Sequence, residues 1–207
     1  MKKIGIFGGV FNPPHNFHFT IAQSILNENK DFVKIIFVPT GNKYDKPEVI
    51  DAEHRFNMLK LICDKNEHFA VSRFEIDSKE QPYSYETLDH FKSIYPDSEL
   101  YFIFGTDNLK TFSKWKNPEY LLKNYSLFVY ERGTDKIDEI IEHDEFLQKY
   151  KENIKKANCD IFTNLNSSFI RKKMLEGKNV SYLIPDSVYE YIKKNKLYEQ
   201  PENLYFA

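Results

Sequence analysis

Short apolar runs alternate along the chain with longer segments in which apolar residues recur at helical spacing. The runs are rich in Ile, Val and Phe and predict strands at 4–7, 33–38, 70–76, 100–104 and 127–130. The segments between them predict helices at 19–26, 53–62 and 85–94, followed by a short helical region before the last strand. This β-α-β-α order is typical of a Rossmann-like α/β fold, with an open, mostly parallel sheet and helices on both faces.

The second half of the chain predicts further helices. Residues 135–156 are highly charged and predict a surface helix, and residues 168–176 and 186–194 predict a short C-terminal helical region. We expect a single domain over residues 1–198. Residues 199–207 are set apart as a tail, because Glu202-Asn203-Leu204-Tyr205-Phe206 resembles the recognition sequence of a protease used to remove tags.

In open parallel sheets, ligands bind beyond the carboxyl ends of the strands. Three loops in this chain follow predicted strands and are polar or contain glycine: 8–16, 39–50 and 105–108. The functional site is therefore expected where these three loops meet.

Composition and charge narrow the class of protein. The 207 residues carry 29 basic and 31 acidic side chains that are interspersed, so duplex nucleic acid and anionic lipid are not expected partners. No apolar run approaches the roughly 18 residues needed to cross a bilayer. Two cysteines, Cys63 and Cys159, are too few for a secreted disulfide scaffold, and we expect a cytoplasmic protein.

The loop after the first strand carries the most distinctive chemistry. Gly8 and Gly9 permit close approach of a ligand to the backbone, and a helix beginning near His18 offers unpaired N–H groups to an anion. His15 and His18 can add ring N–H donors to phosphate oxygens. Two surface histidines beside a turn are the alternative interpretation, and a zinc site lacks further ligands at suitable spacing.

This loop reads Gly8-Gly9-Val10-Phe11-Asn12-Pro13-Pro14-His15-Asn16-Phe17-His18 and resembles the GG-x-F-D-P-x-H-x-G-H loop of the nucleotidyltransferase superfamily. Other segments, in order, are similar to those of bacterial nicotinate-mononucleotide adenylyltransferases. They are Val38-Pro39-Thr40 with Lys46, residues 52–59, Ser84-Tyr85-Glu86-Thr87-Leu88, residues 102–109 with Trp115, Asn166-Ser167-Ser168-Phe169-Ile170-Arg171, and residues 182–198. The resemblance covers residues 2–198 and implies one nucleotidyltransferase domain.

The chain departs from the family pattern at several positions. Phe17 stands where the family has Gly, Asn12 where it usually has Asp, and Asn166-Ser167-Ser168 where it has Ser-Ser-Thr. Phe17 lies between the two histidines. We expect it to keep negative φ and to turn its ring away from the phosphates, toward solvent or the flank of the adenine pocket.

The resemblance implies transfer of the adenylyl group of ATP to nicotinate mononucleotide, which gives deamido-NAD and pyrophosphate. Mg²⁺ is expected to arrive with ATP, because the sequence has no dedicated carboxylate cage, and no metal-ligating residue is assigned. Another phosphorylated acceptor, such as phosphopantetheine, and a catalytically impaired nucleotide-binding homologue remain open. The sequence leaves the choice between nicotinate and nicotinamide mononucleotide open, as it does the oligomeric state.

The resemblance also implies a role for each matching residue. The catalytic residues are expected to be His15, His18, Lys46 and Arg171. The residues expected to bind ATP are Gly8, Gly9, Phe11, Gly105, Asp107 and Ser168. Those expected to bind nicotinate mononucleotide are Asn12, Thr40, Tyr83, Ser84, Thr87, Trp115 and Arg132. Arg55, inside a predicted helix, is interpreted as structural.

Overall fold

The apolar runs of the sequence form the strands of one parallel sheet. The computed structural model describes residues 1–44, 48–157 and 165–199. In these residues six strands pair in the order β3-β2-β1-β4-β5-β6, and every pairing is parallel. Their bounds are β1 Lys3–Gly9, β2 Phe32–Pro39, β3 Phe69–Val71, β4 Glu99–Gly105, β5 Ser126–Tyr130 and β6 Ile154–Lys156. The predicted open α/β sheet is confirmed.

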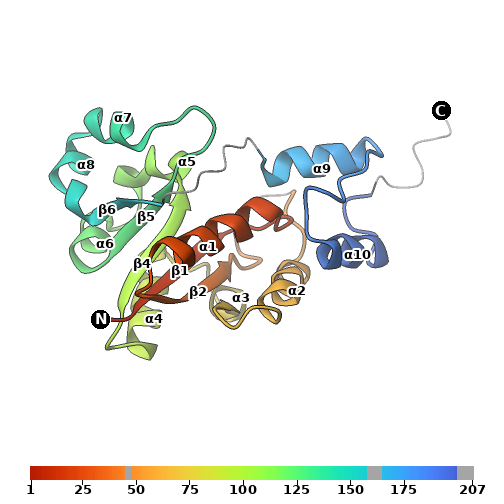
Figure 1. Cartoon of the computed structure of the whole chain (residues 1–207), viewed down its shortest axis with the longest axis horizontal. Coiled ribbons are helices and arrows are strands. Elements are labelled where there is room, and N and C mark those ends of the chain that lie inside the picture. Colours follow the sequence, from red (N-terminus) through yellow and green to blue (C-terminus); the bar gives the residue numbers. More distant parts are fainter. Residues whose placement is uncertain (45–47, 158–164, 200–207) are drawn as a thin grey trace.

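Helices cover both faces of the sheet, as the alternating pattern predicts (Figure 1). The longer ones are α1 Asn16–Glu28, α2 Ala52–Cys63, α4 Ser84–Ile94 and α6 Pro118–Asn124. Side chains of α1 and α2 pack into one core, and those of α4 and α6 pack into the core on the opposite face. The shorter helices are α3 Phe74–Asp77, α5 Thr106–Leu109, η1 Phe112–Lys114, α7 Ile137–Glu142, α8 Glu145–Lys149, η2 Lys151–Asn153, α9 Ser167–Leu175 and α10 Asp186–Lys194.

The strands read as continuous apolar runs because both of their faces are buried. On β4, Phe102 and Phe104 point into the core beneath α4 and α6, and Tyr101 and Ile103 point into the core beneath α1. Side chains alternate between the two faces of a strand, so a strand in the middle of a covered sheet needs apolar residues at every position.

The C-terminal helices form a third core away from the sheet. Met58 of α2 packs with Ile170 of α9 and with Val188 and Ile192 of α10. Figure 1 shows α9 and α10 (blue) at one end of the molecule beside α2 (gold). The predicted C-terminal helical region is therefore present, and it packs on a helix that itself covers the sheet.

The direction of the strand order reverses beside β1. On β1, Ile6 pairs with Ile36 of β2 on one side and with Phe102 of β4 on the other. The chain winds outward from β1 to β3, returns to β4, and then winds outward the other way to β6. Such a switch point opens a crevice at the carboxyl ends of its two strands, which is where the sequence places the site.

The predicted strand 70–76 is wrong in its second half. Strand β3 ends at Val71, and residues 74–77 form the short helix α3. The reason is local, because the Ser72 hydroxyl accepts a hydrogen bond from the backbone N–H of Phe74 and turns the chain out of the sheet.

The single charged helix predicted over residues 135–156 is also wrong. The segment breaks into α7, α8, η2 and strand β6. Asp144 starts a new helix by accepting hydrogen bonds from the N–H groups of Phe146 and Leu147. Strand β6 contains two exposed lysines, Lys155 and Lys156, which suit a short edge strand and obscure its apolar signal.

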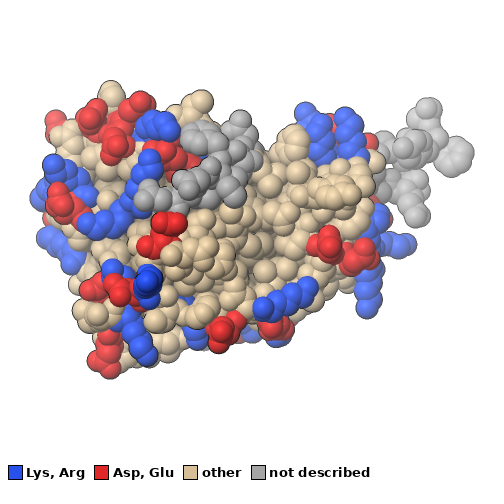
Figure 2. Space-filling model, viewed as in Figure 1, with Lys and Arg blue, Asp and Glu red and all other residues tan. Residues whose placement is uncertain are grey.

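Charge is mixed over the molecular surface. In Figure 2 basic and acidic side chains are interspersed on the face shown, beside a broad region without charged residues. In the part of the chain that the structure describes, no helix is long and apolar enough to span a membrane.

Phe17 lies in the first turn of α1 and its ring is buried. Its exposed fraction is 5%, and its ring meets the Tyr130 ring edge-on at a centroid distance of 5.9 Å. Its φ is not positive, as expected. The ring turns into the core that α1 forms with the sheet. Of the two expected directions, solvent is therefore wrong, and the flank of the adenine pocket stays a prediction.

We predict that Phe17→Gly lowers the free energy of unfolding by about 4 kcal/mol, because a buried phenyl group is removed. Denaturant unfolding measures this loss. The matched control is Phe169→Gly in the first turn of α9, where the phenyl group is 43% exposed. That variant is expected to lose only about 1 kcal/mol, the usual effect of glycine in a helix. Equal losses for the two variants would mean that the Phe17 ring contributes no core packing.

Candidate active site

A cavity of about 1330 Å³ opens at the carboxyl ends of β1, β4 and β5. Its walls include Gly8 and Gly9 of β1, Phe104 of β4 and Tyr130 of β5. Pockets for one small ligand usually measure roughly 300–1,000 Å³, so this cavity has room for more than one such ligand. It lies at the switch point of the sheet, where the three predicted loops meet.

The loop after β1 is held by a buried aromatic ring. Phe11 has φ of 52°, in the left-handed region that glycine favours, and its ring is 3% exposed. The ring packs edge-on against Phe7 and His18, with centroid distances of 5.7 and 5.0 Å. The left-handed residue of this loop is thus Phe11, and burial of its ring stabilises that backbone conformation.

The glycines before Phe11 make room for aromatic rings of the protein itself. A Cβ atom on Gly8 would lie 2.8 Å from the ring of Phe102, and one on Gly9 would lie 3.1 Å from the ring of Phe11. The sequence predicts that these glycines let a ligand approach the backbone. Both do line the cavity, and the space that their missing side chains leave is filled by Phe102 and Phe11.

The two histidines are stacked at the start of α1, where His15 is the N-cap residue. Their ring centroids are 3.7 Å apart. His18 lines the cavity, whereas His15 is fully buried and is not among the lining residues. Among the described residues, neither ring nitrogen of His15 has a hydrogen-bond partner. The structure therefore puts His18 at the cavity and His15 behind it.

Burial keeps both histidines neutral. Desolvation, with the nearby Arg132 charge, lowers the pKa of His15 to about 3, and desolvation lowers the pKa of His18 well below its ordinary value. The backbone N–H of His15 donates to Nδ1 of His18 over 3.1 Å. A neutral imidazole whose Nδ1 is an acceptor carries its proton on Nε2, so His18 keeps one N–H donor.

Helix α9 brings Ser168 and Arg171 to the wall of the cavity. The N-terminus of α9 is held on the first loop, because the Ser167 hydroxyl donates to the carbonyl of Pro13 over 2.9 Å. The guanidinium of Arg171 donates through Nη1 to the carbonyl of Asn12 over 2.8 Å and through Nη2 to the Ser168 hydroxyl. Arg171 thus holds the first loop and also lines the cavity.

Asp107 and Arg132 form an ion pair on the β4–β5 side of the cavity. Arg132 Nη1 lies 3.0 Å from Asp107 Oδ2, and both residues line the cavity. The sequence assigns Asp107 to ATP and Arg132 to nicotinate mononucleotide, yet the two lie side by side. Gly105 is packed behind them, since a Cβ atom there would lie 2.7 Å from Asp107 Oδ1 and 2.8 Å from the Tyr130 ring. Gly105 does not line the cavity.

Trp115, Tyr83 and Ser84 line the cavity together. The indole of Trp115 packs against Phe104 and Phe112, with centroid distances of 5.4 and 5.1 Å. This packing leaves the tryptophan half-buried at the wall.

Thr87 is placed differently from the prediction, because it is fully buried and lies outside the lining. Its hydroxyl donates to Glu75 Oε1 over 2.8 Å.

Glu75 is a buried glutamate at the cavity that the sequence prediction missed. It also accepts a hydrogen bond of 2.6 Å from Gln81 Nε2, and Gln81 Oε1 in turn accepts from the backbone N–H of Gly41. Desolvation raises the pKa of Glu75 to about 7, against the hydrogen bonds from Thr87 and Gln81 that lower it. The sequence signal for this residue is a glutamate between the apolar residues Phe74 and Ile76. The prediction of a strand over 70–76 concealed that signal.

Arg55 joins the loops after β1 and β2. Its side chain is fully buried in α2 and donates to the carbonyls of Val10, Thr40 and Ile50 over 2.8, 2.6 and 3.0 Å. Burial lowers the pKa of its guanidinium. The structural interpretation of Arg55 agrees with these contacts, and they place Thr40 at the cavity wall.

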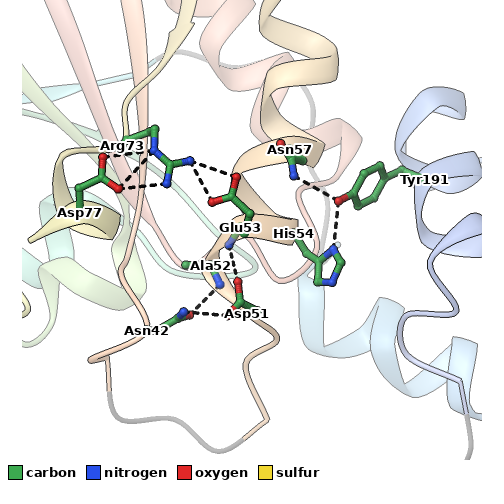
Figure 3. Close-up of polar contacts among 9 residues, drawn as sticks. All are labelled: Asn42, Asp51, Ala52, Glu53, His54, Asn57, Arg73, Asp77 and Tyr191. Atoms are coloured by element: carbon green, nitrogen blue, oxygen red, sulfur yellow. Dashed lines mark hydrogen bonds and ion pairs between the residues drawn. The ribbon is translucent and has the colours of Figure 1, made fainter.

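The second loop joins β2 to α2, and the start of α2 anchors it through its described residues 40–44 and 48–51. Figure 3 shows Asn42 bonded to Asp51 and Ala52, with Asp51 also capping the helix at Glu53. On the same helix, His54 and Asn57 meet the hydroxyl of Tyr191 from α10. Helix α2 therefore carries contacts to the second loop and to the C-terminal helix.

Most of the predicted site residues reach this cavity. Those that line it are Gly8, Gly9, Phe11, Asn12, His18, Thr40, Tyr83, Ser84, Asp107, Trp115, Arg132, Ser168 and Arg171. His15, Thr87 and Gly105 lie behind its walls. Lys46 lies outside the described residues. The roles of the lining residues stay predictions, which their shared position supports.

Comparison with solved structures extends the likeness of the fold over nearly the whole chain. A Plasmodium falciparum nicotinic acid mononucleotide adenylyltransferase complexed with NaAD superposes with a TM-score of 0.78 at 24% identity, covering 96% of this chain and 98% of that one. A putative nicotinate-nucleotide adenylyltransferase from Vibrio parahaemolyticus gives a TM-score of 0.66 at 21% identity, covering 96% of each chain.

Sequence comparison gives the family. Residues 6–200 match the cytidylyltransferase-like family. A probable nicotinate-nucleotide adenylyltransferase from Clostridium tetani is 37% identical, and one from Clostridium acetobutylicum is 38% identical. Each alignment covers 96% of this chain and 100% of the relative. The chain therefore belongs to the cytidylyltransferase-like family and, within it, to the nicotinate-nucleotide adenylyltransferases.

Proposed function

We propose that this protein transfers the adenylyl group of ATP to nicotinate mononucleotide, forming deamido-NAD and releasing pyrophosphate. The observation that carries the proposal is that one cavity of about 1330 Å³ brings together His18, Arg171 and Trp115. A phosphate-binding wall and an aromatic wall in one space suit a reaction between two nucleotides. Full-length relatives named for this activity support the same assignment.

The reaction makes one phosphorus–oxygen bond and breaks another. A phosphate oxygen of nicotinate mononucleotide attacks the α-phosphorus of ATP, and the bond from the α-phosphorus to the bridging oxygen breaks, so that pyrophosphate leaves. Such a transfer depends mainly on holding the reactants in line and on stabilising the developing negative charge. The residues of the protein are not required to form a covalent intermediate.

His18 and the start of α1 are suited to the transferred phosphate. Neutral His18 presents Nε2–H as a fixed donor, because His15 N–H holds its Nδ1. The backbone N–H groups of the first turn add partial positive charge. His15 is assigned to orienting His18 by ring stacking and by this backbone contact, since its own ring lies behind the cavity wall.

Arg171 and Ser168, which line the cavity from α9, are suited to the departing pyrophosphate. A guanidinium offers two parallel donors to phosphate oxygens, which a lysine ammonium does not. Arg171 is already fixed by its bonds to Asn12 and Ser168 and so needs little reorganisation when ATP binds. Asp107 and Arg132 are assigned to the nucleotide at the β4–β5 side, where they are paired.

Trp115 is suited to stack on the pyridine ring, with Tyr83 and Ser84 beside it in the same wall. Thr87 is assigned to supporting Glu75, which itself lines the cavity, through their hydrogen bond.

We assign Mg²⁺ to the ATP substrate. In residues 1–44, 48–157 and 165–199 no three His, Cys, Asp or Glu side chains gather at metal-binding geometry. A magnesium ion bound mainly by substrate phosphates suits such a site.

Pyrophosphate release with MgATP and nicotinate mononucleotide tests the proposal. Wild-type protein is expected to release one pyrophosphate for each deamido-NAD formed. His18→Ala is expected to lower kcat/KM by about 10²–10³, the loss of one preorganised donor at a developing charge. His68→Ala, on the surface, is the matched control and is expected to keep wild-type kcat/KM.

The acceptor is tested in the same assay with nicotinamide mononucleotide and phosphopantetheine. Turnover of either in preference to nicotinate mononucleotide would reassign the acceptor. No pyrophosphate release with any acceptor, despite binding of ATP, would contradict catalysis and indicate an impaired homologue. Wild-type kcat/KM in His18→Ala would place the reacting phosphate elsewhere.

The buried carboxyl of Glu75 links the protonation of the protein to its stability. Its pKa is about 7 in the folded chain against an ordinary value of 4.5. Between these values the folded state holds a proton that the unfolded chain has lost. The stability from this group is therefore complete below pH 4.5 and is lost as the pH rises through about 7.

We predict that wild-type protein loses stability relative to Glu75→Gln as the pH rises from 5 to 7, by about 1 kcal/mol on average for each pH unit. Denaturant unfolding of both proteins at several pH values measures the difference. Glu190→Gln, at an exposed position of α10, is the control. Parallel curves for wild type and Glu75→Gln would contradict a raised pKa at Glu75.

A further inference from the structure

Asn12 is the point where three distant segments meet. Its side chain is 2% exposed and donates through Nδ2 to the carbonyl of Glu48 over 3.0 Å. Its Oδ1 accepts from the backbone N–H of Ile50 over 3.4 Å and from the hydroxyl of Tyr198 over 2.7 Å. Its own carbonyl accepts from Arg171. Asn12 thus ties the first loop to the second loop, to α9 and to the C-terminal segment, residues 182–198.

The hydroxyl of Tyr198 makes the shortest of the side-chain hydrogen bonds of Asn12. Without it, Oδ1 keeps only the long contact to Ile50. The two ends of an amide are nearly equal in size, so only the donors and acceptors around them fix which way the group points. A phenol O–H and a backbone N–H on one side, and a carbonyl on the other, fix Asn12 with Oδ1 toward Tyr198.

This arrangement needs asparagine rather than aspartate at position 12. A carboxylate can accept from Tyr198, but its second oxygen would face the carbonyl of Glu48 with no hydrogen to share. The departure of Asn12 from the aspartate of the motif therefore fits the particular partners that this chain supplies.

Tyr198 reaches Asn12 from a C-terminal segment that is itself fastened. The backbone turns back after α10 through left-handed residues at Lys196 and Tyr198, with φ of 50° and 59°. Leu197 and Tyr198 pack against the third core, which α2, α9 and α10 form. Burial raises the pKa of the Tyr198 hydroxyl, so it remains a neutral donor near pH 7.

The same segment also holds the start of α1. Asn16 donates its backbone N–H to the carbonyl of Leu183 over 3.1 Å and its side-chain amide to the carbonyl of Tyr182 over 3.1 Å. The C-terminal segment therefore contacts both ends of the turn that carries His15. Tyr198 itself is not among the residues that line the cavity.

We infer that Tyr198 is a positioning residue for adenylyl transfer, which acts through Asn12 to hold the first and second loops in their catalytic arrangement. The inference rests on the proposed function for its activity readout. It goes beyond that function because it makes the geometry of the phosphate site depend on a residue 186 positions away along the chain.

The test is Tyr198→Phe, which removes the hydroxyl and leaves the ring. Because Asn12 then loses the bond that orients it, kcat/KM is expected to fall about 5- to 20-fold, mainly in kcat. Tyr191→Phe is the matched control. It removes another tyrosine hydroxyl of the C-terminal segment, bonded to His54 and Asn57 outside the cavity, and kcat/KM is expected to stay within about twofold of wild type.

A double-mutant cycle separates this role from general stabilisation. If Tyr198 acts through Asn12, Tyr198→Phe costs little further activity in an Asn12→Ala background. Equal losses in the wild-type and Asn12→Ala backgrounds would overturn the inference. Wild-type kcat/KM in Tyr198→Phe, or equal losses in Tyr198→Phe and Tyr191→Phe, would also overturn it.

Amide hydrogen exchange gives a readout that does not depend on turnover. Exchange at residues 10–12 and 48–50 is expected to be faster in Tyr198→Phe than in wild type, and unchanged in Tyr191→Phe. Unchanged exchange in Tyr198→Phe would overturn the inference. Lack of activity in wild-type protein, together with this exchange pattern, would contradict the proposed function and leave Tyr198 as the residue that orders the two loops.

Discussion

A single buried guanidinium holds the two loops on which the site depends. Arg55 is fully buried, and its guanidinium donates hydrogen bonds to the carbonyls of Val10, Thr40 and Ile50. Burial of a charge is costly unless hydrogen bonds replace water, and these carbonyls supply them. The first and second loops are therefore mutually fixed before any nucleotide arrives, at the switch point where the parallel sheet opens.

The remaining contacts extend this fixed arrangement to the side chains that are proposed to bind the substrates. Asn12 joins the same two loops and lines the cavity, and Arg171 donates a hydrogen bond to its carbonyl. His18 is oriented by the backbone of His15 and is kept neutral by burial. Electrostatic catalysis gains most when donors are in place before charge develops, because no reorganisation is then needed during the reaction. Most of the side chains that orient the site bond to backbone groups. The geometry of the site therefore depends on the conformation of the loops.

The sequence predicts the sheet and the location of the site well, for clear physical reasons. Strands buried on both faces need apolar residues at each position, so β1, β2, β4 and β5 stand out as Ile-, Val- and Phe-rich runs. Ligand loops must follow such strands in a parallel sheet. Strand β6 was missed because an edge strand of three residues with two lysines has no such run.

The inner contacts of the site could not be predicted in the same way. Thr87 matches a family motif, but its hydroxyl faces Glu75, which only folding brings near. The sequence places His15 and His18 in the same loop, three residues apart, with nothing to distinguish their roles. Only the folded structure, in which the two rings stack, shows which one faces the cavity. Tyr198 joins Asn12 across nearly the whole length of the chain. Phe11 takes a left-handed backbone because its ring is buried, a tertiary effect that outweighs local preference.

The most direct test of a preassembled dinucleotide site is a pair of crystal structures, one free and one with deamido-NAD. The account predicts the dinucleotide in this cavity, with a phosphate at His18 and the pyridine ring on Trp115. The backbone of residues 8–12 and of Thr40 is expected to agree between the two structures within about 1 Å. Binding outside the cavity, or a displacement of these loops by several times that distance, would contradict the account.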